Sequence, residues 1–265
     1  MEKVVIIPTY NEKENISRII RAIFSLQQGF HILVIDDNSP DGTAQIVRDL
    51  QAQFPDKLFL EERKGKLGLG TAYIYGFHWA LKKGYQFIFE MDADFSHNPA
   101  DLKRLYEACK SGGADLAIGS RYVKGGGTVN WPWDRVFLSK GGSLYTRIIT
   151  WMPVNDTTAG FVCYRREVLE AINLDQIQFL GYAFQIEMKF AAWKLGFRIK
   201  EVPIIFEDRK YGASKMHKGI VKEGILGVLK LRWYSLFKDY RNRVKNNNAP
   251  AMPPVSREEV LAKSK

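Results

Sequence analysis

Apolar positions in the first 120 residues follow two alternating patterns. Short, mainly apolar runs predict buried β-strands, and they lie at 4–7, 32–35, 58–60, 87–91 and 114–118. Between these runs, apolar residues recur at helical spacing; the clearest set is Ile16, Ile19, Ile20, Ile23 and Phe24. We expect further helices over 44–53 and 71–81. Strands alternating with helices predict an α/β fold with a mostly parallel sheet covered on both faces.

Capping signals indicate where two of these helices begin. Asn11 followed by Glu14 is typical of a helix N-terminus, so we expect the first helix to open there. Asn98-Pro99 places a cap residue before a proline in the first turn, which predicts a helix after the fourth strand.

The chain becomes less regular from 122 to 160. Gly125-Gly126-Gly127 beside Trp131 and Trp133 favours either a mobile lid or acceptor loop, or a plain surface loop. The two tryptophans could accordingly contact an acceptor or only pack against the body. The residue pattern leaves these alternatives open.

The C-terminal part is basic and amphipathic. Val221, Ile225, Val228, Leu229 and Leu236 recur among lysines and arginines, which predicts a helix with Trp233 and Tyr234 available for an interface. Such a helix either packs on the body with a solvated charged face or docks on a membrane surface. Beyond 246, three asparagines and three prolines indicate a tail that need not fold.

The net charge of +10 is concentrated in one region. Between Arg209 and Lys245 there are 11 Lys or Arg residues against only Glu223 and Asp239. Taken alone, such a patch suits anionic lipid headgroups or nucleic acid equally well. The sequence offers no nucleic-acid recognition motif, so we expect no nucleic-acid partner.

Several protein classes are disfavoured by missing patterns. No run of about 18 apolar residues is present, so no transmembrane helix is expected, and the run at 4–7 is too short for a signal peptide. There is no GxGxxG and no GxxxxGK[ST], which argues against dinucleotide enzymes and P-loop NTPases. Cys109 and Cys163 form no CxxC motif and are expected to be reduced and buried rather than disulfide-bonded. Such cysteine usage favours a cytosolic protein.

Three polar clusters follow predicted strands. They are Pro8-Thr9-Tyr10-Asn11-Glu12, Asp36-Asp37-Asn38-Ser39-Pro40-Asp41-Gly42, and Asp92-Ala93-Asp94. Parallel strands end at one edge of a sheet, where ligands bind, so we expect the carboxylates of the three clusters to converge. Close carboxylates repel unless a cation is present. Mg²⁺ or Mn²⁺ is held by such carboxylates together with substrate phosphate oxygens.

The motifs resemble those of the family 2 glycosyltransferases, and among them the polyprenol (dolichyl) phosphate mannose synthases. The matching segments span about residues 3 to 216 and are VVIIPTYNEKENI, VIDDNSPDGT, KGKLGLGTAYIYGF, MDADFSHNP, GSRY, the stretch from Trp133 to Gly142, GYAFQIEM and EDRKYGASK. The resemblance implies a GT-A type, Rossmann-like catalytic domain over 1–216. A basic interfacial helix region over 217–245 and a disordered tail over 246–265 would follow.

The resemblance also implies residue roles. Pro8, Tyr10 and Glu12 would hold the guanine and ribose, with Ile35 and Asp37 completing the nucleoside pocket. Asp92, Ala93 and Asp94 would form the metal motif, with Asp92 and Asp94 as metal residues and Asp94 the direct ligand; Ser96 stands where some members have a glutamine ligand. Arg121, Arg209 and Lys215 would contact the diphosphate or the acceptor phosphate and, with Asp94, form the catalytic set. Arg135 and Ser139, four apart on one helical face, would be the acceptor-phosphate pair.

The implied reaction moves mannose from GDP-mannose to a polyprenyl phosphate with inversion, using Mg²⁺ or Mn²⁺. Another nucleotide sugar such as UDP-glucose is the alternative donor. A phosphate acceptor is already ionised at neutral pH and needs no general base, so Glu187 is interpreted as orienting a Lys or Arg. Asp156 is either a loop cap or a group supporting the acceptor site, and His97 a turn residue. The expected location is the cytoplasmic face of a membrane, bound peripherally to anionic lipid or through a membrane partner protein.

Overall fold

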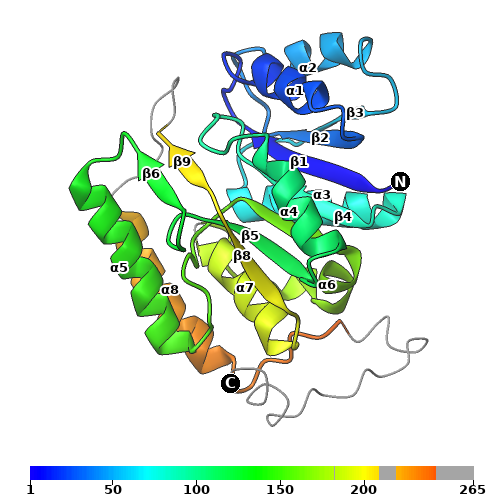
Figure 1. Cartoon of the computed structure of the whole chain (residues 1–265). Helices are drawn as coiled ribbons and strands as arrows, with labels where there is room; N and C mark the ends of the chain where they lie inside the picture. The colour runs from blue at the N-terminus through cyan, green and yellow to red at the C-terminus, as the bar shows by residue number, and fades with distance from the viewer. Residues whose placement is uncertain (182, 209–218, 243–265) are drawn as a thin grey trace.

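The computed structural model describes residues 1–181, 183–208 and 219–242. Its centre is a seven-stranded sheet in the order β3-β2-β1-β4-β7-β5-β8 (Figure 1). The strands are β1 (Lys3–Thr9), β2 (Phe30–Asp36), β3 (Leu58–Glu62), β4 (Phe87–Glu90), β5 (Leu116–Ser120), β7 (Val162–Arg165) and β8 (Ile199–Pro203). Only β7 runs antiparallel to its neighbours. The predicted α/β fold with a mostly parallel sheet is confirmed.

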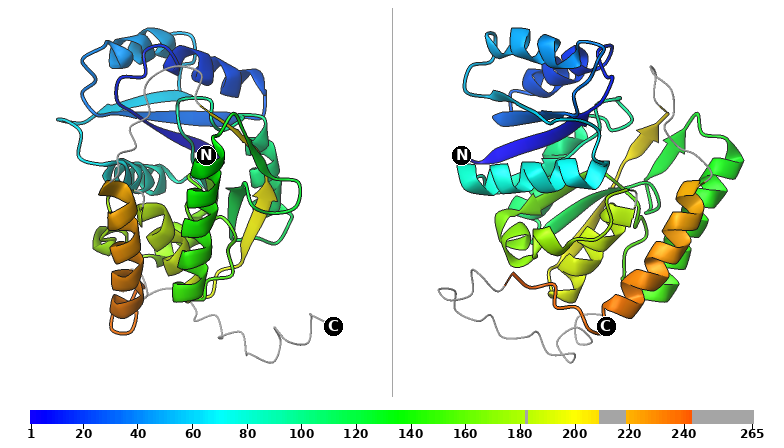
Figure 2. Two further views of the ribbon diagram at one scale, coloured as in Figure 1. Left: turned by 90° about the vertical axis from the view of Figure 1, so that its left-hand side faces the viewer. Right: turned by 180° about the vertical axis from the view of Figure 1, so that it is seen from behind.

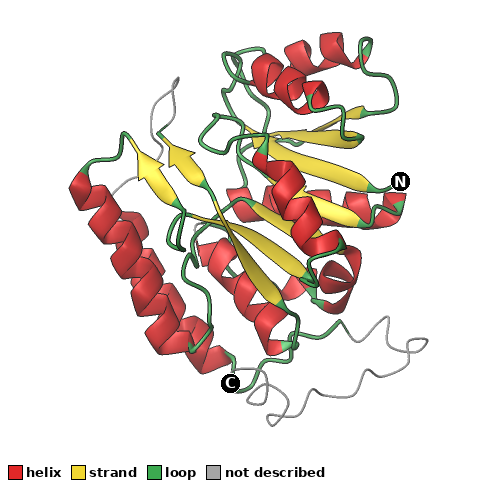
Figure 3. Cartoon of the chain, in the orientation of Figure 1, coloured by secondary structure: helices red, strands yellow, loops and turns green. Residues whose placement is uncertain are grey.

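Helices cover both faces of the sheet (Figure 3). One face packs against α1 (Ile16–Ser25), α2 (Thr43–Gln51) and α4 (Asp101–Lys110), and the other against α3 (Leu69–Lys83), α6 (Arg166–Ala171) and α7 (Ala183–Lys194). A short 3₁₀ helix, Leu174–Gln176, precedes α7. Each face buries a continuous apolar cluster, and fully burying one such side chain contributes about 1.5–3 kcal/mol.

Close contact between α3 and the sheet depends on Gly76. A Cβ at this position would lie 2.8 Å from side-chain atoms of both Ile6 and Ile35. Any larger residue would therefore push α3 away from β1 and β2.

The first helix begins later than its capping signal suggests. Asn11 is in the left-handed region with φ +57°, and α1 begins at Ile16. The N–H groups of Asn11, Glu12 and Lys13 instead donate to side chains of the loop after β2, namely Ser39, Thr43 and Asp41. The polar residues of the first cluster therefore join two loops and do not cap a helix.

The region 122–160 is more regular than predicted. It contains β6 (Gly127–Val129), which pairs in parallel with β9 (Ile205–Glu207), and the 18-residue helix α5 (Trp133–Thr150). The helical face predicted for Arg135 and Ser139 lies on α5, and the extent of regular structure around it was not predicted. The buried residues of α5 are Ser143, Thr146 and Thr150, while Tyr145 and Ile149 are partly buried against the core. Its inward face therefore mixes small polar and larger apolar side chains.

The basic C-terminal helix is present as α8 (Gly219–Tyr234) and packs against α5 and α7 (Figure 2). Val228 and Leu231 are buried in that contact, while Ile225, Leu229 and Trp233 are exposed. The outward face is thus apolar as well as charged. Of the two alternatives for this helix, packing on the body is observed, and docking on a membrane stays a prediction. The proposed tail, 246–265, lies outside the described residues.

Two further expectations concern cysteines and membrane crossing. Cys109 and Cys163 are free and buried, as predicted. Among the described residues, no helix combines the length and apolar content needed to cross a membrane.

Candidate active site

The carboxyl ends of β2, β1 and β4 lie side by side. Thr9 at the end of β1 is in register with Asp36 at the end of β2, and Ile6 is in register with Glu90 at the end of β4. The three polar clusters therefore emerge at one edge of the sheet, as the parallel arrangement predicts.

The acidic residues after β2 mainly shape their own loop. The Asp36 carboxylate accepts hydrogen bonds from the Thr9 hydroxyl (2.8 Å) and from the Ser39 N–H (2.8 Å) and hydroxyl (2.6 Å). Asp41 accepts from the N–H groups of Lys13 and Thr43 and from the Thr43 hydroxyl. Each negative charge is stabilised locally, so neither carboxylate depends on a cation.

The predicted convergence of all three clusters on one cation is wrong for the described residues. Within 1–181, 183–208 and 219–242, no group of three or more His, Cys, Asp or Glu side chains could hold a metal ion. The reason is the local hydrogen bonding of Asp36 and Asp41 together with an ion pair at Asp37. Asp92 and Asp94 lie at the same edge, after β4, together with the partly exposed Glu12 after β1.

Asp37 is buried in an ion pair with Arg63. The Arg63 Nε lies 2.6 Å from Asp37 Oδ1, and Nη1 donates to the Thr71 hydroxyl at 2.7 Å. Burial raises the pKa of Asp37, and the guanidinium opposes that rise. Arg63 also fixes the loop 63–68, whose Lys66 ammonium lies 5.1 Å from the centre of the Tyr10 ring. Sequence reasoning missed Arg63, which no motif in the first half distinguished.

The other nucleoside-site candidates differ in exposure. Pro8, Tyr10 and Glu12 are partly exposed at the edge, and Glu12 Oε2 accepts a hydrogen bond from Asn15 at 2.9 Å. The Ile35 side chain is fully buried below Gly76. Its inward direction follows from the alternation of side chains along β2. This side chain belongs to the core and not to the exposed wall of a pocket.

The predicted metal motif, Asp92-Ala93-Asp94, forms a tight turn after β4. Ala93 and Asp94 are buried, and Asp94 Oδ1 accepts hydrogen bonds from the Ser96 N–H at 3.1 Å and hydroxyl at 2.5 Å. The Asp92 side chain is 40% exposed, so it can reach a ligand from solvent. Phe95 turns the chain with φ +61°. Ser96 therefore orients the carboxylate that is the predicted direct ligand.

His97 supports this turn from inside the protein. Its Nδ1 accepts a hydrogen bond from the Asp92 N–H at 3.3 Å, and its ring stacks on Phe161 with centroids 4.8 Å apart. Burial lowers the pKa of His97 to about 4, so the ring is neutral at pH 7 and Nδ1 can accept. The residue is part of the turn, but its buried contacts were not predicted.

Arg121 is held by Asp156. Both side chains are buried, and the guanidinium donates to the carboxylate through Nε (2.7 Å) and Nη2 (2.6 Å); the Arg121 N–H adds a bond of 3.0 Å. Glu201 in turn accepts hydrogen bonds from the N–H groups of Asn155 and Asp156. Asp156 therefore orients the Arg121 side chain, and its support of an acceptor site stays a prediction.

The predicted acceptor pair lies on one side of α5. Arg135 Nη1 is 2.9 Å from Asp208 Oδ1, and the guanidinium lies 4.0 Å from the centre of the Trp131 ring. Ser139 accepts a hydrogen bond from the Tyr122 hydroxyl at 2.6 Å. Arg121 lies 5.4 Å from the same Trp131 ring, so the tryptophan joins two predicted phosphate contacts.

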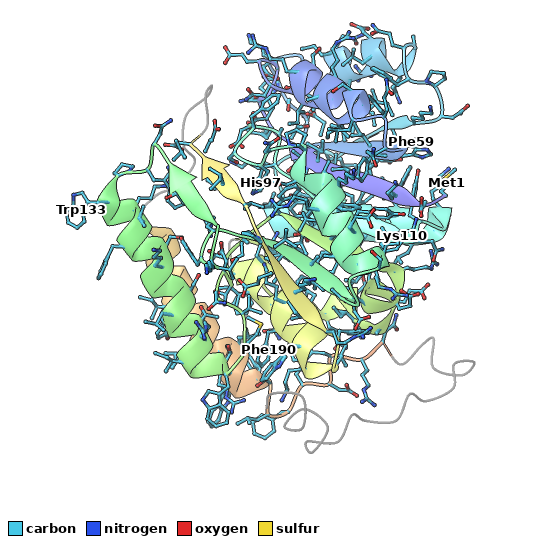
Figure 4. The ribbon with its side chains drawn as sticks, viewed as in Figure 1. Met1, Phe59, His97, Lys110, Trp133 and Phe190 are labelled. Carbon is cyan, nitrogen blue, oxygen red and sulfur yellow. The ribbon has the colours of Figure 1, made fainter. Side chains whose placement is uncertain are left out.

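Trp133 and Glu187 lie outside this group of side chains. Trp133 is 82% exposed and projects away from the body (Figure 4). Glu187 is buried, and its carboxylate accepts hydrogen bonds from the N–H groups of Gln178 and Phe179 and from the Lys238 ammonium. The prediction that Glu187 orients a lysine or arginine is confirmed. Arg209 and Lys215 lie outside the described residues.

A buried polar group beneath the metal motif was not predicted. The Lys189 ammonium donates to the Ala159 carbonyl at 2.6 Å and to the Gln185 carbonyl at 3.1 Å, while Tyr164 donates to Glu90 at 3.4 Å. Burial raises the pKa of Glu90 to about 8 and lowers that of Lys189 to about 8. Helix α7 is buried all round, so no periodic pattern in the sequence reveals these positions.

Comparisons with known proteins agree with this architecture. The family described as glycosyl transferase family 2 matches residues 4–172. The chain is 47% identical over 224 residues to the polyprenol monophosphomannose synthase of Mycolicibacterium smegmatis, covering 84% of each chain. It is 46% identical over 240 residues to the undecaprenyl-phosphate mannosyltransferase of Micrococcus luteus, covering 89% of this chain and 98% of the relative.

A solved structure has the same fold at low identity. The glucosyl-3-phosphoglycerate synthase of Mycobacterium tuberculosis, crystallised with Mn²⁺, UDP and glucosyl-3-phosphoglycerate, superposes with a TM-score of 0.64 at 18% identity. The superposition covers 87% of this chain and 79% of the other. With a family match over more than half of its length and two relatives along most of it, the chain belongs to glycosyl transferase family 2.

Proposed function

We propose that this enzyme transfers mannose from GDP-mannose to a polyprenyl phosphate with inversion, giving a β-linked polyprenyl phosphate mannose. The observation that carries the proposal is the 46–47% identity, over 84–89% of the chain, to two enzymes named for mannosyl transfer to such lipids. Arg121 and Arg135, which lie on either side of Trp131, suit a phosphate acceptor.

On the donor side, Tyr10 and Asp37 would receive the nucleoside and Asp92 and Asp94 a divalent cation. Two carboxylates after a strand end, with phosphate oxygens completing the coordination, match the preference of Mg²⁺ and Mn²⁺ for hard oxygen ligands. When bound, such a cation neutralises the charge that develops on the departing diphosphate. The Ser96 hydroxyl orients the Asp94 carboxylate, and the His97 ring holds the backbone N–H of Asp92.

On the acceptor side, the lipid phosphate is its own nucleophile. Its second pKa is about 6, so the dianion predominates at neutral pH. A phosphate oxygen would form the bond to the anomeric carbon as the bond from that carbon to the diphosphate breaks, on the opposite face. Arg121 and Arg135 would hold and neutralise the acceptor, with Ser139 and the predicted contacts Arg209 and Lys215 beside them.

A membrane surface is the proposed source of the acceptor. Helices α5 and α8 lie side by side, joined by the hydrogen bond from the Tyr145 hydroxyl to the Ile225 carbonyl and by Arg232 packed over Trp151 (Figure 2). Their outward faces share large exposed apolar side chains: Trp133, Phe137, Leu144, Ile148, Trp151, Ile225, Leu229, Trp233 and Phe237. Aromatic residues beside lysines and arginines suit the interface of an anionic bilayer.

We assign this two-helix face to peripheral contact with the cytoplasmic surface of a membrane. The concentration of positive charge in the chain between Arg209 and Lys245 supports lipid as the occupant. A membrane partner protein is the competing occupant. It would show as binding to native membranes but not to protein-free vesicles.

The donor and acceptor are tested in one assay. Purified protein is incubated with Mn²⁺, a short polyprenyl phosphate and either GDP-mannose or UDP-glucose, and the glycolipid is measured by mass spectrometry. Product with GDP-mannose is expected. Product with UDP-glucose alone would overturn the donor assignment, and no product with either would overturn the acceptor assignment.

A further inference from the structure

Phe206 occupies a central place between the two halves of the candidate site. It belongs to β9, which lies outside the seven-stranded sheet and pairs only with β6 among the described strands. Its ring makes an edge contact with His97, with centroids 5.4 Å apart and planes at 79°. It makes a second edge contact with Trp131, at 5.2 Å and 72°. Edge-to-face geometry at these distances is the favoured arrangement of aromatic rings.

Each neighbour of Phe206 belongs to a different part of the site. His97 accepts the hydrogen bond from the Asp92 N–H and so belongs to the metal motif. Trp131 lies under Arg135, the predicted acceptor contact. The Arg121 guanidinium lies 5.4 Å from the Phe206 ring centre. One ring thus contacts the donor-side turn, the central arginine and the acceptor-side tryptophan.

The orientation of Trp131 depends on these ring contacts. Its Nε1–H is buried and has no hydrogen-bond partner among the described residues. Among the described residues, the plane of the indole is therefore set by its contacts with Phe206, Arg121 and Arg135 and not by a hydrogen bond. Asp208, which directly follows β9, also pairs with Arg135, so the segment that carries Phe206 contacts both Trp131 and its neighbouring guanidinium.

We propose that Phe206 is a positioning residue that sets the acceptor-phosphate cations at a fixed place relative to the metal motif. This inference rests on the proposed function, because it assigns Arg135 to the acceptor. Transfer requires the phosphate oxygen and the anomeric carbon to meet in line, and a misplacement of about 1 Å can cost 100-fold in rate. A flat ring held by two edge contacts fixes that separation better than a flexible aliphatic side chain.

The test compares Phe206→Leu, which keeps apolar bulk, with Phe206→Tyr, which keeps the ring. For Phe206→Leu we expect kcat to fall about 10- to 100-fold, with GDP–Mn²⁺ affinity by calorimetry and the melting temperature close to wild type. Phe206→Tyr should restore most of kcat. Phe59→Leu is the matched control, since Phe59 also contacts an aromatic ring, Trp79 at 5.0 Å, but lies in β3. Its kcat should be unchanged.

A double variant and an activity-independent measurement complete the test. If Phe206 acts through Trp131, the double variant Phe206→Leu/Trp131→Leu should lose no more kcat than the more damaging of the two single variants. Amide exchange should rise together at 92–97 and 131–136 in Phe206→Leu and at neither segment in Phe59→Leu. Unchanged kcat, additive losses, or exchange rising in only one segment would overturn the inference. If the wild-type protein transfers no mannose, the proposed function is rejected. The amide-exchange data would still show whether Phe206 connects segments 92–97 and 131–136.

Discussion

The Asp156 carboxylate grips the Arg121 guanidinium edge-on, through hydrogen bonds of 2.7 Å and 2.6 Å, with both side chains buried. Bidentate geometry fixes the plane of the guanidinium as well as its position. Arg121 is therefore held in one orientation before any substrate arrives. Glu201, which binds the Asp156 N–H, extends this support to β8.

Replacing Asp156 by Asn should damage both stability and transfer. The variant leaves a buried guanidinium without its counter-charge, and breaking a buried pair in this way costs about 3–5 kcal/mol. Transfer should fall because Arg121 loses its fixed plane. Urea unfolding gives the first quantity and kcat the second. Asp101→Asn is the control, because its ion pair with Arg104 is half exposed and should contribute under about 1 kcal/mol. Equal losses in the two variants would contradict the assigned role.

Replacing Asp94 by Ala should abolish transfer while the protein remains folded. Asp94 is the buried carboxylate of the metal motif, and it lies in a turn outside the apolar core. Calorimetry with GDP and Mn²⁺ should show that Mn²⁺ no longer strengthens nucleotide binding. Asp41→Asn is the matched control, since Asp41 follows a neighbouring strand but accepts hydrogen bonds from Thr43 and from the Lys13 N–H. Retained metal-dependent binding in Asp94→Ala would show that the cation lies elsewhere.

Stability should decline as the pH falls below about 6.5, partly because of His31. Its Nδ1 lies 2.8 Å from the Tyr85 hydroxyl, and burial lowers its pKa below the usual value of about 6.5. The unfolded chain then takes up a proton at a higher pH than the folded chain, so protonation favours unfolding. The contribution of His31 is fully present above 6.5 and is lost at lower pH. His31→Gln keeps an acceptor for Tyr85 but cannot titrate, so its unfolding free energy should depend less on pH between 7.5 and 5. Identical pH profiles would contradict this assignment.

The sheet was predictable because its strands are short apolar runs separated by helices with one apolar face. The apolar run at 4–7 indicates a strand, and a helix is indicated by the spacing of Ile16, Ile19, Ile20 and Ile23. Strand β7 was missed, since its four residues enter between β4 and β5 from far along the chain. Helix α7 was missed as a periodic element because it is buried on every side.

The site was predictable in its residue types but less so in its contacts. Asp92 and Asp94 stand out as a motif, whereas Asp36 and Asp41 carry the same charge and accept hydrogen bonds from their own loop and from residues in and after β1. Sequence spacing cannot distinguish a carboxylate that binds a cation from one satisfied by nearby N–H groups. Likewise, Phe206 belongs to no motif, and only the tertiary structure places it between His97 and Trp131.

Replacing Trp133 and Phe137 together by Ser should weaken membrane binding without unfolding the protein. Both side chains are more than three-quarters exposed on α5, so their removal leaves no cavity and exposes no core. Flotation with vesicles containing anionic lipid should recover less of this variant than of the wild type, because about 25 cal/mol is lost per Å² of apolar surface no longer inserted. Tyr75→Ser is the control, since Tyr75 is an exposed aromatic residue on α3.

Turnover of a short, water-dispersed polyprenyl phosphate should stay near wild type, whereas turnover of vesicle-borne acceptor should fall with binding. Deleting 246–265 should change neither the binding to vesicles nor the turnover of either acceptor. If both acceptors are affected equally, or if flotation is unchanged, the two-helix face is not the docking surface.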